Sequence, residues 1–285
     1  MFRLYKMAIL ALGAVAASAT FFACTSNNNQ TEFITGVVNK NSKTESATEE
    51  YNIYKDFEYT TGDDGSISII RYLGNESSVK VPSAINGLPV SVISSRCFQN
   101  EDNPNAVKSV AIPSTVNSIS ALAFYKSKYL QEIICEKNGN YADYNGVLYT
   151  ADFANLVAYP ENRQNTEFIM PDTVTTISCN AFSYCDNLER VVLSPMLEVI
   201  PDYAFSENDS LKEVQAPYNI KSVGYAAFNK CKSLTKITLP PSIMEINEQA
   251  VIECDKLESI EITGDSDFVM EFADSLGVSY KNQYN

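Results

Sequence analysis

The chain has 285 residues, of which 45% are hydrophobic, so it is long and apolar enough to fold as one large domain or two small ones. Its formal net charge of -14 repels a phosphate backbone over most of the surface, and we expect no nucleic-acid partner. The sequence contains no histidine, which excludes most hydrolytic triads and the commonest zinc ligand, so we expect no catalytic residue, metal or cofactor.

Residues 1–23 are typical of a secretory signal, because Arg3 and Lys6 precede an uncharged apolar run and small residues follow it. The sequence FFAC resembles a bacterial lipobox, in which the cysteine is diacylated and becomes the first mature residue. We therefore predict a lipoprotein signal peptide and lipidation of Cys24. The alternatives are a plain signal peptide cut near Ala19 or an uncleaved anchor, although the run is short for a spanning helix, which needs about 20 apolar residues.

Residues 24–50 are rich in Asn, Ser, Thr and Glu, which predicts a flexible polar tether. We expect an exported outer-membrane lipoprotein that meets the membrane only through its lipid anchor. The segment TSNNNQ lacks the acidic cluster that some surface lipoproteins of Gram-negative bacteria carry. Both the cell surface and the periplasmic leaflet therefore remain open as its location.

An aromatic position recurs through most of the remaining chain, and its last three intervals are each 23 residues. It is occupied by Phe98, Phe124, Phe182, Phe205, Phe228 and Val251. Five residues earlier stands a second apolar column, formed by Ile93, Ile119, Ile177, Ile200, Val223 and Ile246. One coil cannot cover its own apolar columns, whereas stacked coils bury them and pair their strands. The recurrence therefore predicts a repeat solenoid.

The repeat can be followed in LERVVLSPMLEVIPDYAFSEN (188–208) and LTKITLPPSIMEINEQAVIEC (234–254). This pattern closely resembles the BspA-type leucine-rich repeat of bacterial surface proteins, and the acidic-Gly turn that follows FEYTT is similar to that family's opening hairpin. The resemblance covers about residues 57–263. It implies a right-handed leucine-rich-repeat stack of about 23-residue coils with short parallel strands. The sequence departs from the family pattern at Val251, where Phe is usual, and at Arg96-Cys97.

We assign the chain from residue 51 onward to one leucine-rich repeat domain. The domain spans residues 51–285. It consists of an N-terminal hairpin cap (51–78), the repeats (79–263) with a hairpin insertion near 138–166, and a C-terminal helical cap (264–285). In the last of these, Asp265, Ser266 and Asp267 are candidate N-caps and Gly277 is a candidate C-terminal stop. The cap is expected to cover the open end of the stack.

Two intervals are longer than the period. The first contains QNEDNPN (99–105) and predicts a loop, and the second contains a strand-turn-strand pattern that predicts a hairpin projecting from the side of the stack. The hairpin carries Tyr141, Tyr144, Tyr149 and Tyr159. These rings either form a contact patch for a partner, since tyrosine supplies contact area at low entropic cost, or pack on the hairpin's own inner face.

Small polar or thiol side chains stand three residues after the aromatic position. They are Ser127, Cys185, Asn208, Cys231 and Cys254. A zinc site requires thiolates in tetrahedral arrangement and not one per coil mixed with Ser and Asn, so we predict a structural ladder that satisfies turn backbone groups. Cys231 and Cys254 fall in adjacent coils, which leaves a disulfide between them open.

Candidate ligand-binding residues lie on the predicted strands and the insertion. One solvent-facing column carries Glu132, Arg190, Glu213 and Lys236, whose alternating charges favour cross-strand pairs. A second column begins with Ile134 and Val192 and continues through Gln215, Thr238 and Glu261. We expect protein contact near its apolar end and near the tyrosines 141, 144 and 149.

Three functional classes follow. The first is a non-catalytic, envelope-tethered monomer that binds a protein or glycan; the resemblance implies adhesion, including adhesion to host matrix. The second is a periplasmic structural or assembly protein. The third is a carboxylate-dependent hydrolase using Asp63 and Asp64, or Asp143 and Asp152, although the first pair fits a hairpin turn better.

Overall fold

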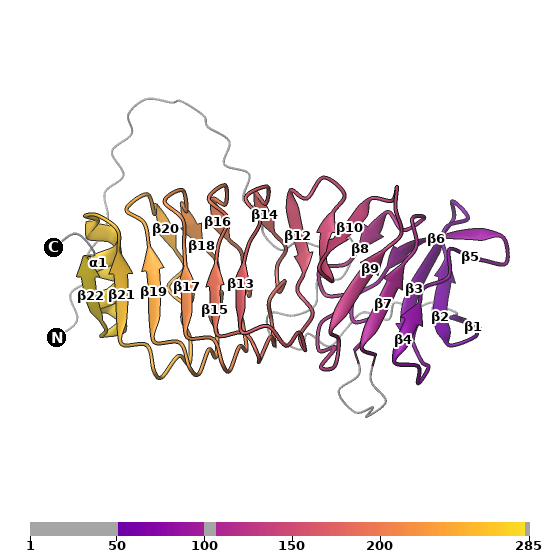
Figure 1. Ribbon diagram of the computed structural model, residues 1–285, viewed down its shortest axis with the longest axis horizontal. Coiled ribbons are helices and arrows are strands. Elements are labelled where there is room, and N and C mark those ends of the chain that lie inside the picture. The colour runs from indigo at the N-terminus through magenta and orange to yellow at the C-terminus, as the bar shows by residue number, and fades with distance from the viewer. Residues whose placement is uncertain (1–50, 100–106, 283–285) are drawn as a thin grey trace, which may run out of the picture.

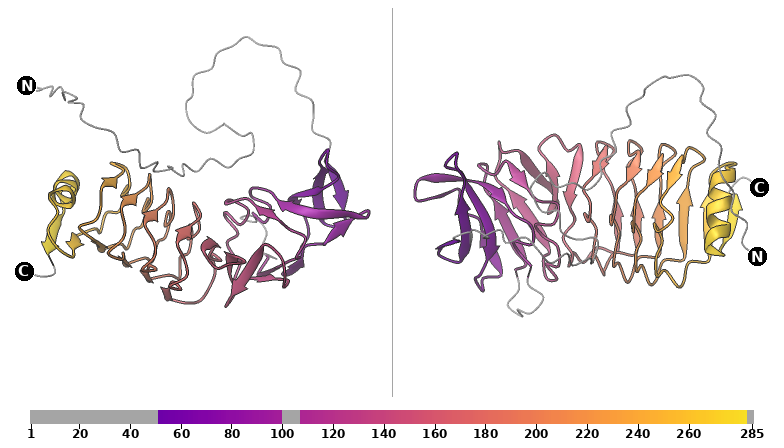
Figure 2. Two further views of the ribbon diagram at one scale, coloured as in Figure 1. Left: turned by 90° about the horizontal axis from the view of Figure 1, so that it is seen from above. Right: turned by 180° about the vertical axis from the view of Figure 1, so that it is seen from behind.

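The computed structural model describes residues 51–99 and 107–282, which form an elongated stack of coils (Figure 1, Figure 2). Four sequence-based predictions concern segments outside these ranges and stay predictions. They are the signal peptide 1–23, lipidation of Cys24, the tether 24–50 and the greater part of the loop at 99–105.

A parallel sheet runs along the C-terminal part of the stack, with one strand from each coil. Its strands are β13 (Glu167–Ile169), β15 (Arg190–Val192), β17 (Glu213–Gln215), β19 (Lys236–Leu239), β21 (Ser259–Ile262) and β22 (Ser279–Asn282). Arg190 pairs with Glu213, which pairs with Lys236, so neighbouring coils are in register at the 23-residue interval. The predicted solenoid with short parallel strands is confirmed.

A second row of short strands closes each coil on another side. A parallel sheet here consists of β16 (Val199–Ile200), β18 (Ser222–Val223) and β20 (Glu245–Ile246). In each of these strands the second residue is buried and the first is more exposed. The apolar column five residues before the aromatic position is therefore a row of buried residues from successive second strands.

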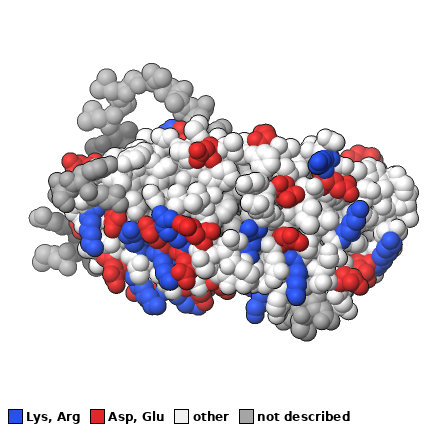
Figure 3. All heavy atoms as spheres, viewed as in Figure 1, with Lys and Arg blue, Asp and Glu red and all other residues white. Residues whose placement is uncertain are grey.

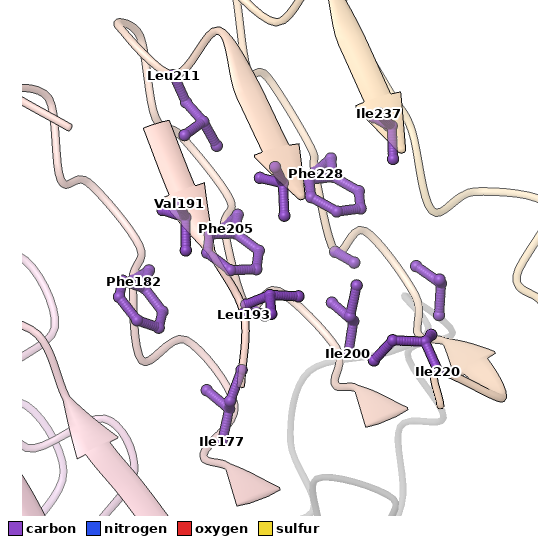
Figure 4. Close-up of a cluster of buried hydrophobic side chains, with 14 of the residues drawn as sticks. Ile177, Phe182, Val191, Leu193, Ile200, Phe205, Leu211, Ile220, Phe228 and Ile237 are labelled. Atoms are coloured by element: carbon purple, nitrogen blue, oxygen red, sulfur yellow. The ribbon is translucent and has the colours of Figure 1, made fainter. Parts of the chain in front are cut away.

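The aromatic side chains form a single file through the core. The ring centroids of Phe182 and Phe205 are 5.0 Å apart, and those of Phe205 and Phe228 are 5.6 Å apart (Figure 4). Tyr159 extends the file, with its ring centroid 5.2 Å from that of Phe182. At the other end the smaller Val251 is only partly buried. The predicted stacking of the repeat aromatics is confirmed.

The insertion forms a meander across the stack and does not project from it. Its strands are β10 (Tyr141–Tyr144), β11 (Val147–Thr150) and β12 (Asn155–Ala158), and β12 pairs in parallel with β14 (Thr176–Ile177). Val147 and Tyr149 belong to the C-terminal core, whereas Leu148 belongs to the N-terminal core. The predicted hairpin around Asp152 is present as β11 and β12, but its predicted projection from the stack is wrong, because β11 carries apolar side chains on both faces and separates the two cores.

The N-terminal part of the stack contains nine strands among the described residues. They are β1 (Asn52–Tyr54), β2 (Phe57–Thr61), β3 (Ile67–Tyr72), β4 (Ser78–Lys80), β5 (Ala84–Ile85), β6 (Leu88–Ile93), β7 (Ser109–Ile112), β8 (Ser118–Ile119) and β9 (Glu132–Cys135). β2 and β3 form the predicted antiparallel hairpin. Its turn uses Gly65 at φ 77° and an Asp64 carboxylate that accepts from the Ser66 backbone N–H at 2.9 Å.

The helix α1 (Asp267–Leu276) covers the C-terminal end of the stack beside β21 and β22 (Figure 1). Ser266 is the N-cap, and its hydroxyl accepts from the backbone N–H of Val269 at 3.3 Å. Gly277 ends the helix at φ 68°, a left-handed conformation that glycine adopts without strain. Val269 and Ala273 are buried, so the predicted helical cap is confirmed.

Candidate functional site

The outer face of the C-terminal sheet carries a continuous string of ion pairs. Arg190 bonds to Glu167 in the preceding coil, and its Nε lies 3.5 Å from Glu213 in the following coil. The Lys236 ammonium then lies 3.1 Å from Glu213 and 3.5 Å from Glu261. Figure 3 shows basic and acidic side chains interleaved over this part of the molecule. Most of the predicted charged column is therefore engaged within the protein.

Further ion pairs join residues one coil apart around the stack. The pairs with their N–O distances are Lys212–Glu189 (2.7 Å), Lys221–Glu198 (2.7 Å), Lys230–Glu207 (2.9 Å) and Lys232–Asp209 (2.9 Å). Hydrogen bonding to Glu207 raises the pKa of Lys230, and bonding to Asp209 raises the pKa of Lys232. In each pair, an acidic residue in one coil is followed 23 residues later by a basic residue at the same position of the next coil. The resulting ion pairs link neighbouring coils along their surface.

Arg190→Ala should lower the free energy of unfolding by about 1 kcal/mol in low salt, because it removes contacts to Glu167, Glu213 and the Gln215 amide oxygen at 2.9 Å. Urea denaturation at low and at about 1 M salt measures the effect, which should shrink as salt screens the pairs. Arg71→Ala is the matched control, since its single pair with Glu58 is 3.7 Å long and more exposed. An equal loss at both salt concentrations would contradict an electrostatic role.

A shallow groove of about 560 Å³ lies at the carboxyl ends of β15, β17 and β19. Its walls combine apolar and polar groups from successive coils, including Val192, Gln215, Tyr218, Asn219 and Thr238. The Tyr218 side chain is 61% exposed. Val192 was predicted from the sequence, whereas Tyr218 was missed because only one coil has an aromatic residue at this turn position. Glu213, which pairs with Arg190 and Lys236, also lines the groove, so the groove borders the string of ion pairs.

The two apolar residues of the predicted contact column lie on different sheets. Val192 lies on β15 and lines the groove. Ile134 lies on β9, which belongs to the sheet β4-β7-β9, and its side chain is 44% exposed. Glu132 of the charged column also lies on β9. The meander of the insertion separates these two residues from Arg190, Glu213 and Lys236, so the predicted columns are not continuous.

The tyrosines of the insertion have different environments. Tyr149 is fully buried, so its prediction as a surface contact residue is wrong; its ring fills the C-terminal core. The Tyr141 hydroxyl accepts from the backbone N–H of Ile119 at 2.9 Å, which ties the meander to the preceding coil. Tyr144 is 57% exposed. Tyr159 is buried in the aromatic file, and this burial raises its pKa to about 12.

Each small side chain of the predicted ladder donates a hydrogen bond to the backbone carbonyl of the aromatic residue in the preceding coil. The donor-to-oxygen pairs are Ser127–Phe98 (3.0 Å), Cys185–Tyr159 (3.7 Å), Asn208–Phe182 (2.8 Å), Cys231–Phe205 (3.0 Å) and Cys254–Phe228 (2.8 Å). A buried carbonyl without a donor would be costly. These contacts account for the alternation of Ser, Cys and Asn at one position, since each supplies a donor in a small volume.

Three of the four carboxylates considered for hydrolysis, those of Asp64, Asp143 and Asp152, accept hydrogen bonds from turn or backbone donors. Hydrogen bonds from Ser66 lower the pKa of Asp64, and hydrogen bonds led by the Thr150 hydroxyl lower that of Asp152. Asp143 accepts from the backbone N–H of Cys135 at 2.8 Å. A glycosidase acid requires a raised pKa, so the shifts at Asp64 and Asp152 have the wrong direction. Within residues 51–99 and 107–282 no cluster of His, Cys, Asp or Glu could hold a metal ion.

Four tyrosines beside the aromatic file form pairs that the sequence did not predict. Tyr125 and Tyr184 meet edge to face at 5.4 Å, and Tyr203 and Tyr225 at 5.3 Å. The Arg96 guanidinium lies over the Tyr125 ring at 5.4 Å. These tyrosines stand at different offsets from the repeat phenylalanine, so no column marks them. Because the rings engage one another and nearby cations, we assign them a structural role.

A family model described as "BspA type Leucine rich repeat region" matches six copies, over residues 91–157 and 157–273. No curated protein matches the chain. Within the part of the chain that the structure describes, no helix has both the length and the apolar character needed to cross a bilayer.

Several solved structures are similar to this chain. A leucine-rich repeat protein from Eubacterium ventriosum is 20% identical with a TM-score of 0.51, covering 81% of this chain and 84% of its own. A leucine-rich cell surface protein from Faecalibacterium prausnitzii is 18% identical with a TM-score of 0.46, covering 76% and 95%. The pneumococcal vaccine antigen PcpA is 15% identical with a TM-score of 0.46, covering 82% and 85%. At these identities the likeness concerns the fold alone.

Proposed function

Since the chain belongs to the BspA-type leucine-rich repeat family, we propose that it is a non-catalytic protein of the cell envelope that binds another protein. The observation that carries this proposal is the groove beside β15, β17 and β19, which joins an exposed aromatic ring to apolar and amide side chains. Tyrosine is enriched among residues that dominate binding energy at protein interfaces. The surrounding ion pairs supply a polar rim of the kind that encloses such contacts.

The shape of the groove favours an extended segment of a partner protein. The groove is open and is lined by residues from several coils, so a partner chain lying along the stack would meet similar turns in succession. The exposed amides of Gln215 and Asn219 offer hydrogen-bonding groups to such a backbone, while Tyr218 and Val192 offer apolar contact. Adhesion to host matrix proteins is the biological setting that we propose for this contact.

Binding of the purified chain to a panel of immobilised soluble proteins and glycans, with matrix proteins included, tests the proposal. We expect saturable binding to a protein that weakens at least about tenfold in Tyr218→Ala, because truncating a central aromatic contact costs about 2 kcal/mol or more and tenfold corresponds to about 1.4 kcal/mol. Val192→Ser should weaken the same interaction. The measurement is the dissociation constant by surface-based or solution titration.

Tyr144→Ala is the matched control, because Tyr144 is 57% exposed, close to the 61% of Tyr218, but lies in the insertion. It should leave the dissociation constant unchanged. Loss of binding in Tyr144→Ala together with unchanged binding in Tyr218→Ala would move the site to the insertion. Binding to glycans alone, with every protein of the panel inert, would contradict a protein partner.

We propose in addition that the chain is exported and anchored through a lipid on Cys24. Its support is the signal-like segment before this cysteine and the polar segment after it. Protease treatment of intact cells separates the two locations, since only a chain on the cell surface is cleaved. A chain that stays intact until the outer membrane is opened would instead support the periplasmic structural role.

A further inference from the structure

The thiols of Cys231 and Cys254 occupy equivalent places in two adjacent coils, and both are free. The two turns run side by side, because the Lys230 backbone N–H donates to the Ile252 carbonyl at 2.7 Å. Both cysteines also converge on the carbonyl oxygen of Phe228. The Cys231 backbone N–H lies 3.4 Å from that oxygen, and the Cys254 sulfur lies 2.8 Å from it.

A disulfide between these cysteines fits the spacing of the stack. Adjacent coils are separated by about 4.8 Å, within the range of about 4.4–6.8 Å between Cα atoms that a disulfide spans. The two side chains are close enough to shift each other's pKa. Oxidation would also leave no carbonyl without a donor. The Phe205 oxygen keeps Asn208 Nδ2 at 3.0 Å, and the Phe228 oxygen keeps the Cys231 backbone N–H.

The two thiols are not equivalent in reactivity. Cys254 is partly exposed, beside the turn where Val251 replaces the usual phenylalanine, whereas Cys231 is fully buried. Interaction with the Cys231 side chain lowers the pKa of Cys254, while interaction with Cys254 and burial raise the pKa of Cys231. Because the thiolate is the nucleophile, Cys254 is the thiol that meets a reagent first.

We propose that Cys231 and Cys254 are an oxidisable dithiol that a small-molecule or protein disulfide converts into a bond joining the last two coils. The Cys254 thiolate attacks one sulfur of the donor disulfide, whose S–S bond breaks and releases one half as a thiolate. Cys231 then loses its proton and attacks the Cys254 sulfur, which releases the second half. The two protein thiols are oxidised, and the donor is reduced to two thiols.

The disulfide would stabilise the C-terminal end of the stack, where the aromatic file contributes least. The file stops at Phe228 because Val251 has no ring, so the last coil lacks the stacking that joins the earlier coils. A disulfide restricts the unfolded chain and so stabilises the segment that it closes. Among the described thiols, Cys185 has no such option, since Asn208 stands at the equivalent place in the next coil.

Treatment of the purified chain with oxidised glutathione near pH 8, followed by alkylation and non-reducing peptide mass spectrometry, tests the proposal. Wild type should yield peptides joined through Cys231 and Cys254, and its melting temperature should rise by several degrees. Cys231→Ser should retain glutathione on Cys254, whereas Cys254→Ser should leave Cys231 unmodified. Neither variant should gain thermal stability. Serine suits both sites because Ser127 fills the same position of an earlier coil.

Three outcomes would overturn the proposal. They are a wild-type chain without the cross-link, a mixed disulfide on Cys254 that persists in the wild type, and a cross-link that uses Cys185 instead. Alkylation of the untreated wild type supplies a measurement that needs no variant to fold. Iodoacetamide should label Cys254 before Cys231, and equal rates or the reverse order would contradict the assigned roles.

Discussion

Phe205→Ala is expected to lower the free energy of unfolding by about 3–5 kcal/mol, the largest loss from any single truncation in the aromatic file. The Phe205 ring is fully buried and lies between the rings of Phe182 and Phe228, at centroid distances of 5.0 and 5.6 Å. Alanine would remove stacking on both sides and leave a cavity where coils meet. Because each coil is stable only through its neighbours, a gap in the middle weakens both halves of the C-terminal core.

Thermal and urea denaturation measure this loss, which corresponds to a drop of about 10 °C in melting temperature. Tyr218→Ala is the control, because its side chain is 61% exposed and its removal should change stability by no more than about 0.5 kcal/mol. Phe205→Leu should lower the free energy of unfolding by an amount between those of Phe205→Ala and Tyr218→Ala. A Phe205→Ala protein as stable as Tyr218→Ala would show that the aromatic file does not hold the coils together.

The sequence predicted the C-terminal coils well because their period is constant. Phe182, Phe205 and Phe228 are 23 residues apart, so one alignment of the chain with itself identifies the core columns, the strands and the ladder. Tyr159 obeys the same interval, since it precedes Phe182 by 23 residues. It was assigned to the insertion because tyrosine replaces phenylalanine there. A search for any aromatic residue at the interval would have found it.

The meander was harder to predict because the alternating pattern of its sequence suggests one buried face, whereas β11 is buried on both. The sequence GVLYT looks like one arm of a solvent-facing hairpin, in which only alternate residues face a core. In the structure Val147 and Tyr149 face one core and Leu148 faces the other. A strand buried on both faces carries a continuous apolar run, and three residues are too short a run to distinguish the two cases.

The groove could not be derived from columns at all. It depends on Tyr218, a single aromatic residue at a turn where neighbouring coils have Pro195 and Pro241. Aligning the repeats identifies the residues that recur in every coil. The groove, in contrast, depends on residues that differ between coils. Val192 was predicted only because it stands with Ile134 at the apolar end of an otherwise mostly polar column. Substitutions at such non-repeating positions alter the surface without altering the stack.

Asn208→Ala is expected to cost about 2–5 kcal/mol, an effect close to that of removing a core ring, although the side chain is small and polar. The Asn208 amide is fully buried. Its nitrogen donates to the carbonyls of Phe182 at 2.8 Å and Phe205 at 3.0 Å, and its oxygen accepts from the Cys185 backbone N–H at 2.6 Å. Alanine would leave the Cys185 donor and the Phe182 acceptor unsatisfied between two coils.

Asn208→Asp and Asn208→Ser separate hydrogen bonding from shape. Aspartate keeps the size and the acceptor but removes the donor and directs a buried charge at two carbonyls, so it should destabilise at least as much as alanine near pH 7. Serine keeps one donor, as Ser127 does in an earlier coil, and should retain more stability than either. Urea denaturation of the three variants gives the order. An Asn208→Asp protein as stable as wild type would mean that the side-chain donor is dispensable, and would contradict its proposed role.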